Sequence, residues 1–289
     1  MTTVQVRPTP RRWLITGVSS GLGRALAEHL LDRGDTVLGT LRKPDQACEF
    51  DGLAPGRSIG LALDVTDESA VSTLVPVAVD RVGGLDVLVN NAGHSLIGAV
   101  EETALVEAKE LMAVNFFAAL QLTQIVLPWF RRQGSGHVVN VSSLAATIGF
   151  PWTAMYSASK SALAAWSDAL AAETASFGIK VTCLEPGGLR TNFASSSLRS
   201  VRESLAAYAE PVAAVKQRYA AAADLMPNDP RKAAAVIAQL VELETPPVRA
   251  AVGADAHSYL TTALEQRIAG YAKDHQLTAT TAFETATTG

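Results

Sequence analysis

The sequence between residues 16 and 23 is Thr16-Gly17-Val18-Ser19-Ser20-Gly21-Leu22-Gly23. It joins a short apolar run, Trp13–Thr16, to a segment with leucine at every fourth position, Leu22–Arg33. We interpret the run as a strand and the segment as a helix. The glycines of the loop, at positions 17, 21 and 23, permit a tight turn and close approach of a phosphate to the backbone. The N-terminus of the helix offers N–H groups to an anion. Although the spacing G-x₃-G-x-G differs from G-x-G-x-x-G, the loop predicts a dinucleotide-binding site.

Strand-like and helix-like segments alternate along the first two-thirds of the chain. The further predicted strands are Thr36–Leu41, Ile59–Leu63, Leu85–Asn90, His137–Ser142 and Ile179–Glu185. The predicted helices between them are Glu68–Val82, Ala104–Arg132 and Tyr156–Phe177. Most of these strands are apolar throughout, which is typical of a parallel sheet that is buried on both faces. We therefore expect an α/β fold with a doubly wound parallel sheet, Rossmann-like in architecture.

No linker interrupts this alternation, so we expect the 289 residues to form a single domain, 1–289. The composition changes over residues 192–227 to Ser, Ala and charged residues, and this stretch predicts a small helical insertion that covers a substrate. The sheet edge would be completed by a helix at Arg231–Leu243, a strand at Val248–Val252 and a helix at Leu260–Tyr271. We expect residues 273–289 to form a flexible tail.

Composition excludes several classes of protein. The chain has 24 Lys and Arg residues against 28 Asp and Glu residues, so it offers nucleic acid no basic surface. Two cysteines cannot form a disulfide framework, and no metal-binding motif is present in the sequence. The apolar run Trp13–Ile15 is too short for a signal peptide, and amides and a proline make Ala113–Phe130 a poor membrane span. We expect a cytoplasmic protein without metal, nucleic-acid or membrane partners.

Further motifs follow the glycine loop in a fixed order. They are Asp64-Val65, Asn90-Asn91-Ala92-Gly93, Asn115, Ser143, Tyr156-x₃-Lys160 and Pro186-Gly187-x₃-Thr191. In these motifs and in its T-G-x₃-G-x-G loop, the sequence resembles the short-chain dehydrogenase/reductase family. The motifs span residues 16–191, about two-thirds of the chain, and the remaining third carries none of them.

The resemblance implies a bound nicotinamide dinucleotide and the residues that hold it. Asp64 and Val65 would flank the adenine, and Asn91 to Gly93 would pass close to the adenosine ribose. Residues 186–191 would cover the nicotinamide carboxamide. The full set expected to bind the cofactor is Gly17, Ser19, Ser20, Gly21, Leu22, Gly23, Arg42, Asp64, Val65, Asn91, Ala92, Gly93, Tyr156, Lys160, Pro186, Gly187, Leu189 and Thr191.

The end of the second strand indicates which dinucleotide is preferred. An acidic residue there binds the ribose 2′-hydroxyl of NAD, whereas a basic residue can accept the 2′-phosphate of NADP. This strand ends Leu41-Arg42-Lys43, with no acidic residue before Asp45. Arg42 can donate two hydrogen bonds to a phosphate, and Ser19 can add a hydroxyl. We therefore expect NADP(H) to be preferred over NAD(H); the alternative is that Arg42 and Lys43 are solvated surface cations.

Tyr156 and Lys160 lie four residues apart at the start of a predicted helix, so their side chains share one face. A free phenol has a pKa of about 10, too high for efficient proton exchange near neutrality. One unit charge at about 4 Å, in an effective dielectric of about 20, supplies about the 4 kcal/mol needed to correct this. We expect Lys160, helped by an oxidised nicotinamide, to lower the pKa of Tyr156 so that it acts as general acid and base.

Two further residues complete the expected catalytic set of Asn115, Ser143, Tyr156 and Lys160. Ser143 follows the fifth strand of the alternating pattern, where its hydroxyl can donate to a carbonyl oxygen as charge develops there. Ser142 competes for this role; the family spacing selects Ser143, and strand alternation points Ser142 the other way. Asn115 lies in an otherwise apolar helix, where it can form an ordinary buried hydrogen bond. In the family it marks a backbone kink that holds a water for proton relay, the interpretation that we favour.

The substrate pocket is expected to be lined by residues that follow the strand ends and by the 192–227 insertion. These residues are mostly apolar: His94, Leu96, Leu144, Phe150, Trp152, Met155 and Phe193. Such a lining favours a hydrophobic carbonyl or alcohol over a sugar phosphate. The helices Ala104–Arg132 and Tyr156–Phe177 are apolar on more than one face, which together with the resemblance predicts a homodimer or homotetramer.

Three functions are compatible with these residues. The complete catalytic set favours an NADP(H)-dependent oxidoreductase that interconverts a carbonyl and a secondary alcohol by hydride transfer. The alternative is a non-catalytic NADP(H)-binding regulatory or scaffold protein, although such relatives typically lose the tyrosine or the lysine. A third possibility, an epimerase or dehydratase, usually requires a longer substrate domain and a different glycine spacing.

Overall fold

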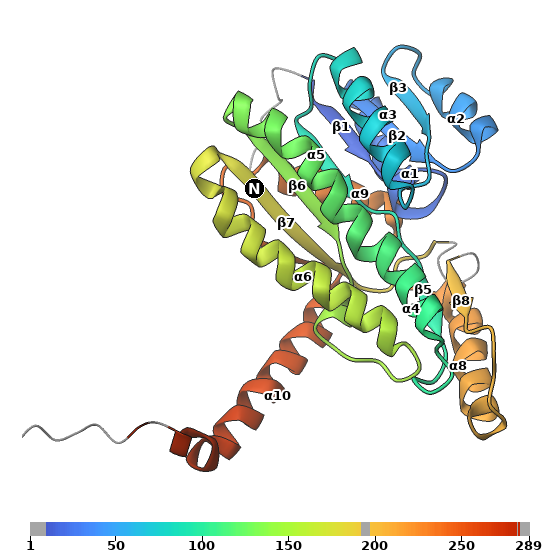
Figure 1. Ribbon diagram of the computed structural model, residues 1–289, viewed down its shortest axis with the longest axis vertical. Helices are drawn as coiled ribbons and strands as arrows, with labels where there is room; N and C mark the ends of the chain where they lie inside the picture. The colour runs from blue at the N-terminus through green and yellow to red at the C-terminus, as the bar shows by residue number, and fades with distance from the viewer. Residues whose placement is uncertain (1–9, 192–196, 282, 284–289) are drawn as a thin grey trace, which may run out of the picture.

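The computed structural model describes residues 10–191, 197–281 and 283. Within these residues a parallel 7-stranded sheet has the strand order β3-β2-β1-β4-β6-β7-β9 (Figure 1). Its strands are β1 (Arg12–Ile15), β2 (Thr36–Leu41), β3 (Ser58–Ala62), β4 (Val87–Asn90), β6 (Gly136–Val141), β7 (Ile179–Pro186) and β9 (Arg249–Val252). The predicted doubly wound parallel sheet is confirmed, and the chain reverses its direction of winding between β1 and β4. In such sheets ligands bind beyond the carboxyl ends of the strands at this reversal.

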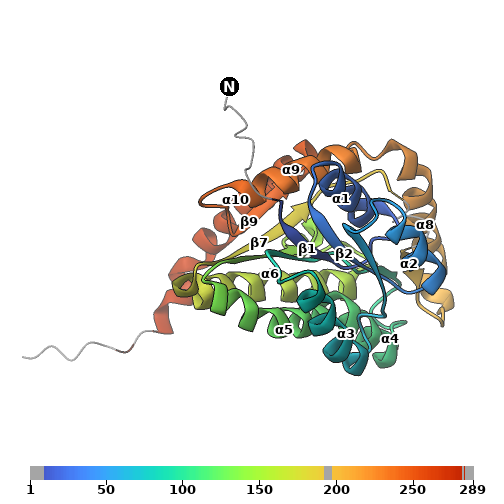
Figure 2. The same cartoon turned by 90° about the horizontal axis from the view of Figure 1, so that it is seen from above.

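Helices cover both faces of the sheet (Figure 2). They are α1 (Gly21–Asp32), α2 (Pro44–Asp51), α3 (Glu68–Arg81), α4 (Leu105–Met112), α5 (Ala118–Gln133), α6 (Ala154–Thr174), α8 (Ala209–Ala222), α9 (Pro230–Glu242) and α10 (Ala254–Thr278). Strand alternation divides the core: Trp13 and Ile15 are buried in the cluster with α1 and α9, whereas Leu14 joins the cluster with α3, α5 and α6. One core thus holds α1, which follows the glycine loop, and the other holds α6, which carries Tyr156 and Lys160.

A second, shorter strand pair lies outside the main sheet. Strand β5 (Ser95–Ile97) pairs in parallel with β8 (Leu198–Ser200), and α8 follows β8. Ile97 packs with Val212 and Val215 of α8 in a small separate core, against which Trp152 also packs. We call residues 197–226 the roof. It occupies most of the predicted helical insertion, whose role in covering a substrate stays a prediction.

Two helices differ from the expected pattern. The long helix predicted at Ala104–Arg132 is divided by a π-helical turn at Ala113–Phe117. Helix α10 extends to Thr278 and projects away from the body (Figure 1), so residues 273–278 of the expected flexible tail are helical. Its run of good helix formers such as Ala, Leu, Gln and Lys, without proline, explains the extension.

The helical stretch Leu105–Gln133 is long and apolar enough to cross a membrane by length and composition. In the fold it lies along one face of the sheet (Figure 2). Leu122, Val126 and Phe130 are buried there in the core. The core helix of a globular protein can have the same length and apolar composition as a membrane-spanning helix. We interpret this stretch as a core helix.

Candidate active site

A cavity of about 650 Å³ lies beyond the carboxyl ends of β1, β4, β6 and β7. The glycine loop forms one wall, and the turn after β6 together with the start of α6 forms another. Except for Gly23, every residue expected to bind the cofactor lines this cavity, as do Ser143, Tyr156 and Lys160. The structure therefore brings most of the motifs that the sequence spreads over residues 16–191 together around one cavity, with Asn115 as an exception.

The glycine loop is held in place by the side chain of Asn91. Its Nδ2 donates to the carbonyl oxygens of Thr16 at 2.8 Å and Gly17 at 3.1 Å. Gly17 has a φ of +72°, which favours glycine, and a Cβ on Gly23 would lie 2.4 Å from Asn91 Nδ2. Gly23 thus allows the helix to approach Asn91, and the side chain of Asn91 positions the loop.

The N-terminus of α1 faces the cavity with donors available. Ser20 precedes the helix in an extended conformation, with a φ of −163°, and its side chain does not cap the helix. The N–H groups of the first helical turn have no partner within the helix, and Gly21 and Leu22 line the cavity. These groups, together with the hydroxyls of Ser19 and Ser20, fit the phosphates of a dinucleotide.

Arg42 and Asp64 lie at the other end of this wall. Arg42 is exposed and lines the cavity, and it makes no ion pair within the described part of the chain. The Asp64 carboxylate accepts from the Thr66 N–H at 2.9 Å and from the Thr66 hydroxyl at 2.7 Å. Burial alone would raise the pKa of Asp64, but the two hydrogen bonds and the nearby Arg42 and Arg199 charges lower it overall. Asp64 is therefore an ionised hydrogen-bond acceptor at neutral pH.

Tyr156 and Lys160 lie in the first turns of α6, as their spacing predicts. Lys160 is 5% exposed, and its Nζ donates to the Val141 carbonyl oxygen at 2.9 Å. The same Nζ lies 5.9 Å from the centre of the Tyr156 ring. Burial lowers the pKa of Lys160 to about 8 and raises the pKa of Tyr156 to about 12. In the protein's own groups burial thus raises the pKa of the phenol, and the expected lowering of the Tyr156 pKa by Lys160 with an oxidised nicotinamide stays a prediction.

The two serines after β6 have different partners. The Ser143 side chain hydrogen-bonds to Tyr156, an interaction that opposes the rise in the tyrosine pKa. Its Oγ also accepts from the Ala145 N–H at 3.1 Å. Ser142 is buried, and its hydroxyl donates instead to the Lys160 carbonyl oxygen at 3.0 Å. The hydroxyl beside that of Tyr156 is thus the hydroxyl of Ser143 and not that of Ser142.

Asn115 lies behind the cavity wall, in the π-helical turn, and is 2% exposed. Its carboxamide bonds to the backbone of His94 and to the Ser159 hydroxyl. π-Helical turns are rare and occur frequently at functional sites. Asn115 thus forms the buried hydrogen bonds of one alternative and lies in the backbone irregularity of the other. That it holds a water for proton relay stays a prediction.

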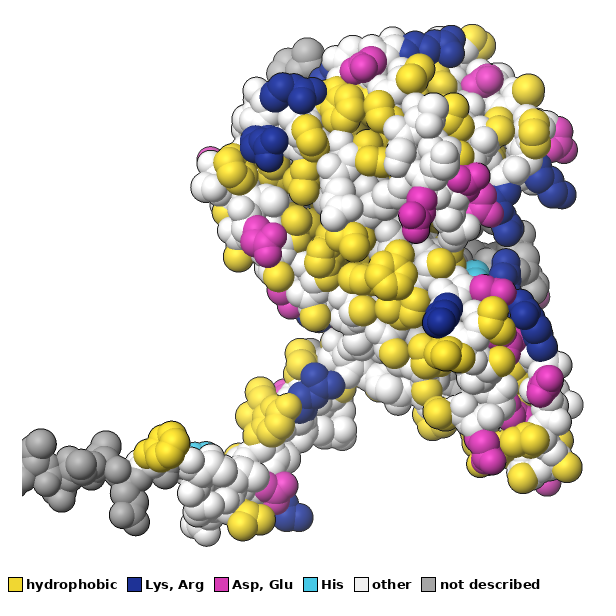
Figure 3. Space-filling view, in the orientation of Figure 1, with side chains coloured by type: hydrophobic (Ala, Val, Ile, Leu, Met, Phe, Trp, Pro, Cys, Tyr) yellow, Lys and Arg dark blue, Asp and Glu magenta, His cyan; other side chains and the backbone are white. Residues whose placement is uncertain are grey.

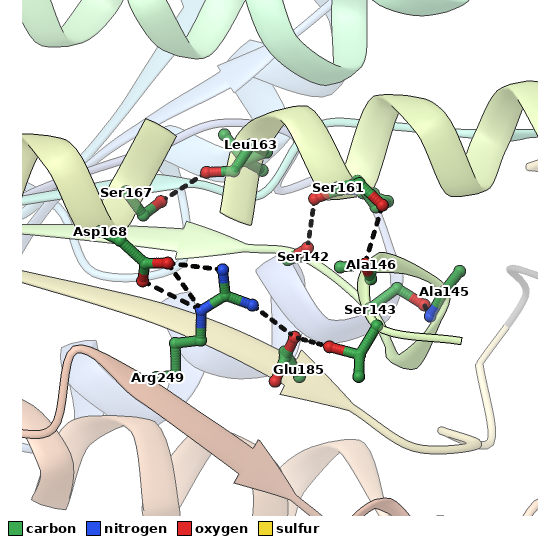
Figure 4. Close-up of polar contacts among 12 residues, drawn as sticks. Ser142, Ser143, Ala145, Ala146, Ser161, Leu163, Ser167, Asp168, Glu185 and Arg249 are labelled. Carbon is green, nitrogen blue, oxygen red and sulfur yellow. Dashed lines mark hydrogen bonds and ion pairs between the residues drawn. The ribbon is translucent and has the colours of Figure 1, made fainter. Parts of the chain in front are cut away.

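The turn after Ser143 is connected to β7 and β9 by a chain of polar contacts (Figure 4). The Thr147 hydroxyl donates to the carboxylate of Glu185 at 2.9 Å, and Glu185 is only 5% exposed. Arg249 donates to Glu185 at 3.3 Å and to the α6 carboxylate of Asp168 at 2.6 Å. A buried carboxylate is tolerated only when paired and hydrogen-bonded. Glu185 thus joins the Ser143 turn to the last strand of the sheet.

The substrate end of the cavity differs from the expected lining. His94, Leu144 and Phe150 line the cavity, whereas Leu96, Trp152 and Met155 do not. Leu96 is buried in β5, and Trp152 packs on Tyr208 in the roof core, with ring centroids 6.1 Å apart. Phe193 lies outside the described residues. Phe150 and Trp152 come from the same loop before α6, but only Phe150 lines the cavity, and Trp152 packs against the roof.

The roof contributes lining residues that the sequence analysis missed. These are Ser197, Leu198, Arg199, Tyr219 and Met226. One signal was present, because Val212, Val215 and Tyr219 recur at helical spacing and so share one face of α8. The direction in which that face points depends on the pairing of β5 with β8, which no sequence motif predicts.

Known proteins are similar to this chain over most of its length. A model of the short chain dehydrogenase family matches residues 11–202. Oxidoreductase BOA17 of Botryotinia fuckeliana is 38% identical over 256 residues, which cover 88% of this chain and 92% of that protein. The 3-ketodihydrosphingosine reductase of Bacteroides thetaiotaomicron is 35% identical over 249 residues, covering 84% and 88% respectively. The crystal structure of a short-chain dehydrogenase from Streptomyces avermitilis, 39% identical, has a TM-score of 0.88 and covers 96% of this chain and 100% of its own.

Proposed function

The chain belongs to the short-chain dehydrogenase family and is an oxidoreductase with a nicotinamide cofactor, and we propose that this cofactor is NADP(H). We further propose that the enzyme interconverts a carbonyl and a secondary alcohol on a mostly hydrophobic molecule. One observation carries the proposal. The Tyr156 and Ser143 hydroxyls, hydrogen-bonded to each other, line the same cavity as the glycine loop.

Each residue then has a defined task. A nicotinamide dinucleotide held by the glycine loop, Tyr156 and Lys160 would supply a hydride for the carbonyl carbon. Tyr156 donates its hydroxyl proton to the carbonyl oxygen, and Ser143 donates a hydrogen bond to the same oxygen as negative charge develops on it. In the reverse direction Tyr156 takes the proton from the alcohol. Lys160, held by Val141, keeps further ammonium donors for a ribose hydroxyl.

The electrostatics support reduction as the direction served by the protein's own groups. With pKa values of about 12 for Tyr156 and about 8 for Lys160, the phenol is protonated and the amine is charged at neutral pH. A protonated phenol is ready to act as an acid. Oxidation requires the phenolate, which burial opposes, so a further positive charge beside Tyr156 is needed in that direction.

The preference for NADP(H) rests on Arg42. It directly follows β2, at the position that faces the adenosine ribose in doubly wound folds, and it makes no ion pair with the described residues. Replacing it in Arg42→Ala should weaken NADPH binding and leave NADH binding unchanged. An unchanged NADPH affinity would show that the assignment is wrong.

The substrate proposal rests on the lining near Tyr156. The cavity lining includes the apolar Leu144, Phe150 and Met226, beside polar residues such as His94, Thr153 and Tyr219. The name of one relative, 3-ketodihydrosphingosine reductase, records a ketone as the substrate of that protein. An apolar pocket with a few converging polar groups is typical of small-molecule sites.

The deciding experiment is an NADPH-oxidation assay with a panel of ketones and aldehydes, run with the wild type and Tyr156→Phe. We expect turnover only in the wild type, with equal NADPH dissociation constants for the two proteins. A wild type that binds NADPH but turns over no carbonyl would favour the regulatory or scaffold alternative. Full activity in Tyr156→Phe would refute the catalytic scheme.

We also propose that the enzyme is a cytoplasmic homo-oligomer. Hydrophobic side chains gather on the face of the body over α5 and α6 (Figure 3). An aromatic patch on this face is formed by Phe116, Phe117 and Trp166, with centroid distances of 5.3 Å and 6.0 Å from Phe116. Phe117 is 53% exposed. A second copy of the chain, packed across these helices, would bury this patch.

A further inference from the structure

The roof carries an arginine, Arg199, that the proposed chemistry does not use. It lies in β8, opposite Leu96 of β5 in the parallel register. The Ser95 N–H donates to the Ser197 carbonyl oxygen at 2.8 Å, and the Val201 N–H donates to the Ile97 carbonyl oxygen at 2.9 Å. Because both flanks of Arg199 are bonded to β5, its backbone has a defined place at the edge of the cavity.

The Arg199 side chain lines the cofactor cavity and makes no ion pair with any residue in the described ranges. Its neighbour Arg202, in contrast, is bound to Glu110 at 2.7 Å. Two arginines three residues apart thus have different surroundings. Arg202 has a carboxylate partner on α4, and Arg199 offers its donors to the cavity.

The charge of Arg199 reaches the same part of the cavity as that of Arg42. Burial and then Arg199 lower the pKa of His94, and Arg42 and Lys160 add smaller effects. Arg42 and Arg199 also both lower the pKa of Asp64. The charges of Arg42, which follows β2, and of Arg199, in the roof, therefore both act on His94 and Asp64, and all four residues line the cavity.

The balance of charge in the cavity is positive. Its cationic lining residues are Arg42, Lys160 and Arg199, and its acidic ones are Asp64 and Glu110. Glu110 is already neutralised by Arg202. The α1 N-terminus adds a partial positive charge at Gly21. A ligand with several phosphate charges matches this distribution, whereas a neutral hydrophobic substrate leaves Arg199 without a partner.

We propose that Arg199 binds phosphate groups of the dinucleotide, so that the roof supplies part of the cofactor site. The inference rests on the proposed nicotinamide dinucleotide and adds to it a residue outside the family motifs. A planar guanidinium can donate two parallel hydrogen bonds to one phosphate, which a lysine cannot reproduce. Cofactor affinity then depends on the same segment that lines the substrate end of the cavity.

The test measures cofactor binding without any substrate, by quenching of tryptophan fluorescence and by calorimetry. The variants are Arg199→Met and Arg199→Lys, with Lys216→Met as the control, because Lys216 is an exposed roof cation that does not line the cavity. Loss of a charge-assisted contact should raise the NADPH dissociation constant about tenfold or more in Arg199→Met. Arg199→Lys should recover part of the affinity, and Lys216→Met should remain within about twofold of the wild type. Thermal melting verifies that each variant is folded.

Two cofactors distinguish the phosphates. If Arg199 binds the pyrophosphate, the affinities for NADPH and NADH fall by equal factors; if it binds the 2′-phosphate, only that for NADPH falls, as in Arg42→Ala. Unchanged affinity for both cofactors in Arg199→Met would overturn the inference. A wild type that binds neither cofactor would instead overturn the proposed function, so the two failures are separable.

Discussion

The carboxamide of Asn115 engages both backbone polar groups of His94: its Oδ1 accepts from the N–H at 3.1 Å, and its Nδ2 donates to the carbonyl oxygen at 3.0 Å. The same Nδ2 donates to the Ser159 hydroxyl at 2.9 Å. One side chain thus joins the π-helical turn, the loop after β4 and the catalytic helix α6. The distance between the cofactor wall and Tyr156 depends on these contacts.

Asn115→Ala should therefore reduce both stability and turnover. It leaves two backbone groups of His94 without a buried partner, at a cost of about 1–3 kcal/mol each, and misplaced reacting groups can reduce kcat by about 100-fold. Urea unfolding and steady-state assays measure these effects. The control Ser159→Ala removes only one partner and should retain most of the activity. A kcat in Asn115→Ala equal to that of the wild type would contradict this positioning role.

The pH dependence of carbonyl reduction should follow Lys160. Its pKa of about 8 lies below that of Tyr156, about 12, so the tyrosine remains protonated throughout the accessible range. We expect kcat/KM to be constant below about pH 8 and to fall above it as Lys160 loses its charge, because kcat/KM reports the free enzyme. In Lys160→Met the residual rate should lose this inflection. An inflection that persists in Lys160→Met belongs to another group.

Stability at acid pH should fall because of His137. It is 2% exposed, its Nδ1 has no hydrogen-bond partner, and burial lowers its pKa to about 3. As the pH is lowered from about 6 to about 5, His137 binds a proton in the unfolded chain but not in the folded protein. The free energy of unfolding therefore decreases as the pH decreases, by at most about 1.4 kcal/mol per pH unit. Urea unfolding at several pH values measures the slope. His137→Gln should flatten it, and substitution of the exposed His257 should not.

Removal of Arg249 should destabilise the Ser143 turn. Arg249→Met leaves the buried Glu185 carboxylate with Thr147 alone, which should cost about 1–3 kcal/mol after discounting for the partial exposure of the arginine. Asp168→Asn, at the exposed end of the network, should cost less than about 1 kcal/mol. The double variant Arg249→Met/Glu185→Gln should regain stability, because it removes the unpaired charge. Additive losses in the double variant would show that the two residues are not coupled.

The proposed oligomer should depend on the aromatic patch. Phe117→Glu places a charge on an exposed aromatic site of the α5–α6 face and should convert the oligomer to monomers, which size-exclusion chromatography with light scattering detects. Val236→Glu, at a 41% exposed position of α9 on the opposite face of the sheet, is the control. A wild type that is monomeric at micromolar concentration would dispose of the proposal.

The architecture could be predicted because its signals are local. Apolar strands such as Thr36–Leu41 have the same bounds in the sequence analysis and in the structure, and the glycine loop marks the first βα unit. Asn115 attracted attention for a similar reason, as a polar residue in an apolar helix. Its place in a π-helical turn fits a backbone that departs from the regular helix.

The remainder depends on contacts between distant segments. Strands β5 and β8 are each three residues long, and their pairing joins residues about a hundred positions apart. Without that pairing, neither the burial of Trp152 in the roof core nor the access of Arg199 and Tyr219 to the cavity can be inferred. The pKa of Tyr156 was similarly beyond reach, because desolvation depends on the complete surroundings of the phenol.

The roof has a consequence for how such enzymes diversify. Residues 197–226 form one contiguous block, fastened to the body through β5 and a small core of its own, while Asn115, Ser143, Tyr156 and Lys160 all lie outside it. On the proposed assignment, recombination that exchanges this block between relatives would transfer the substrate lining contributed by the roof and leave the four proposed hydride-transfer residues with the recipient. With Arg199 inside the block, a chimera would also inherit part of its coenzyme affinity from the donor, so the two traits would be genetically linked.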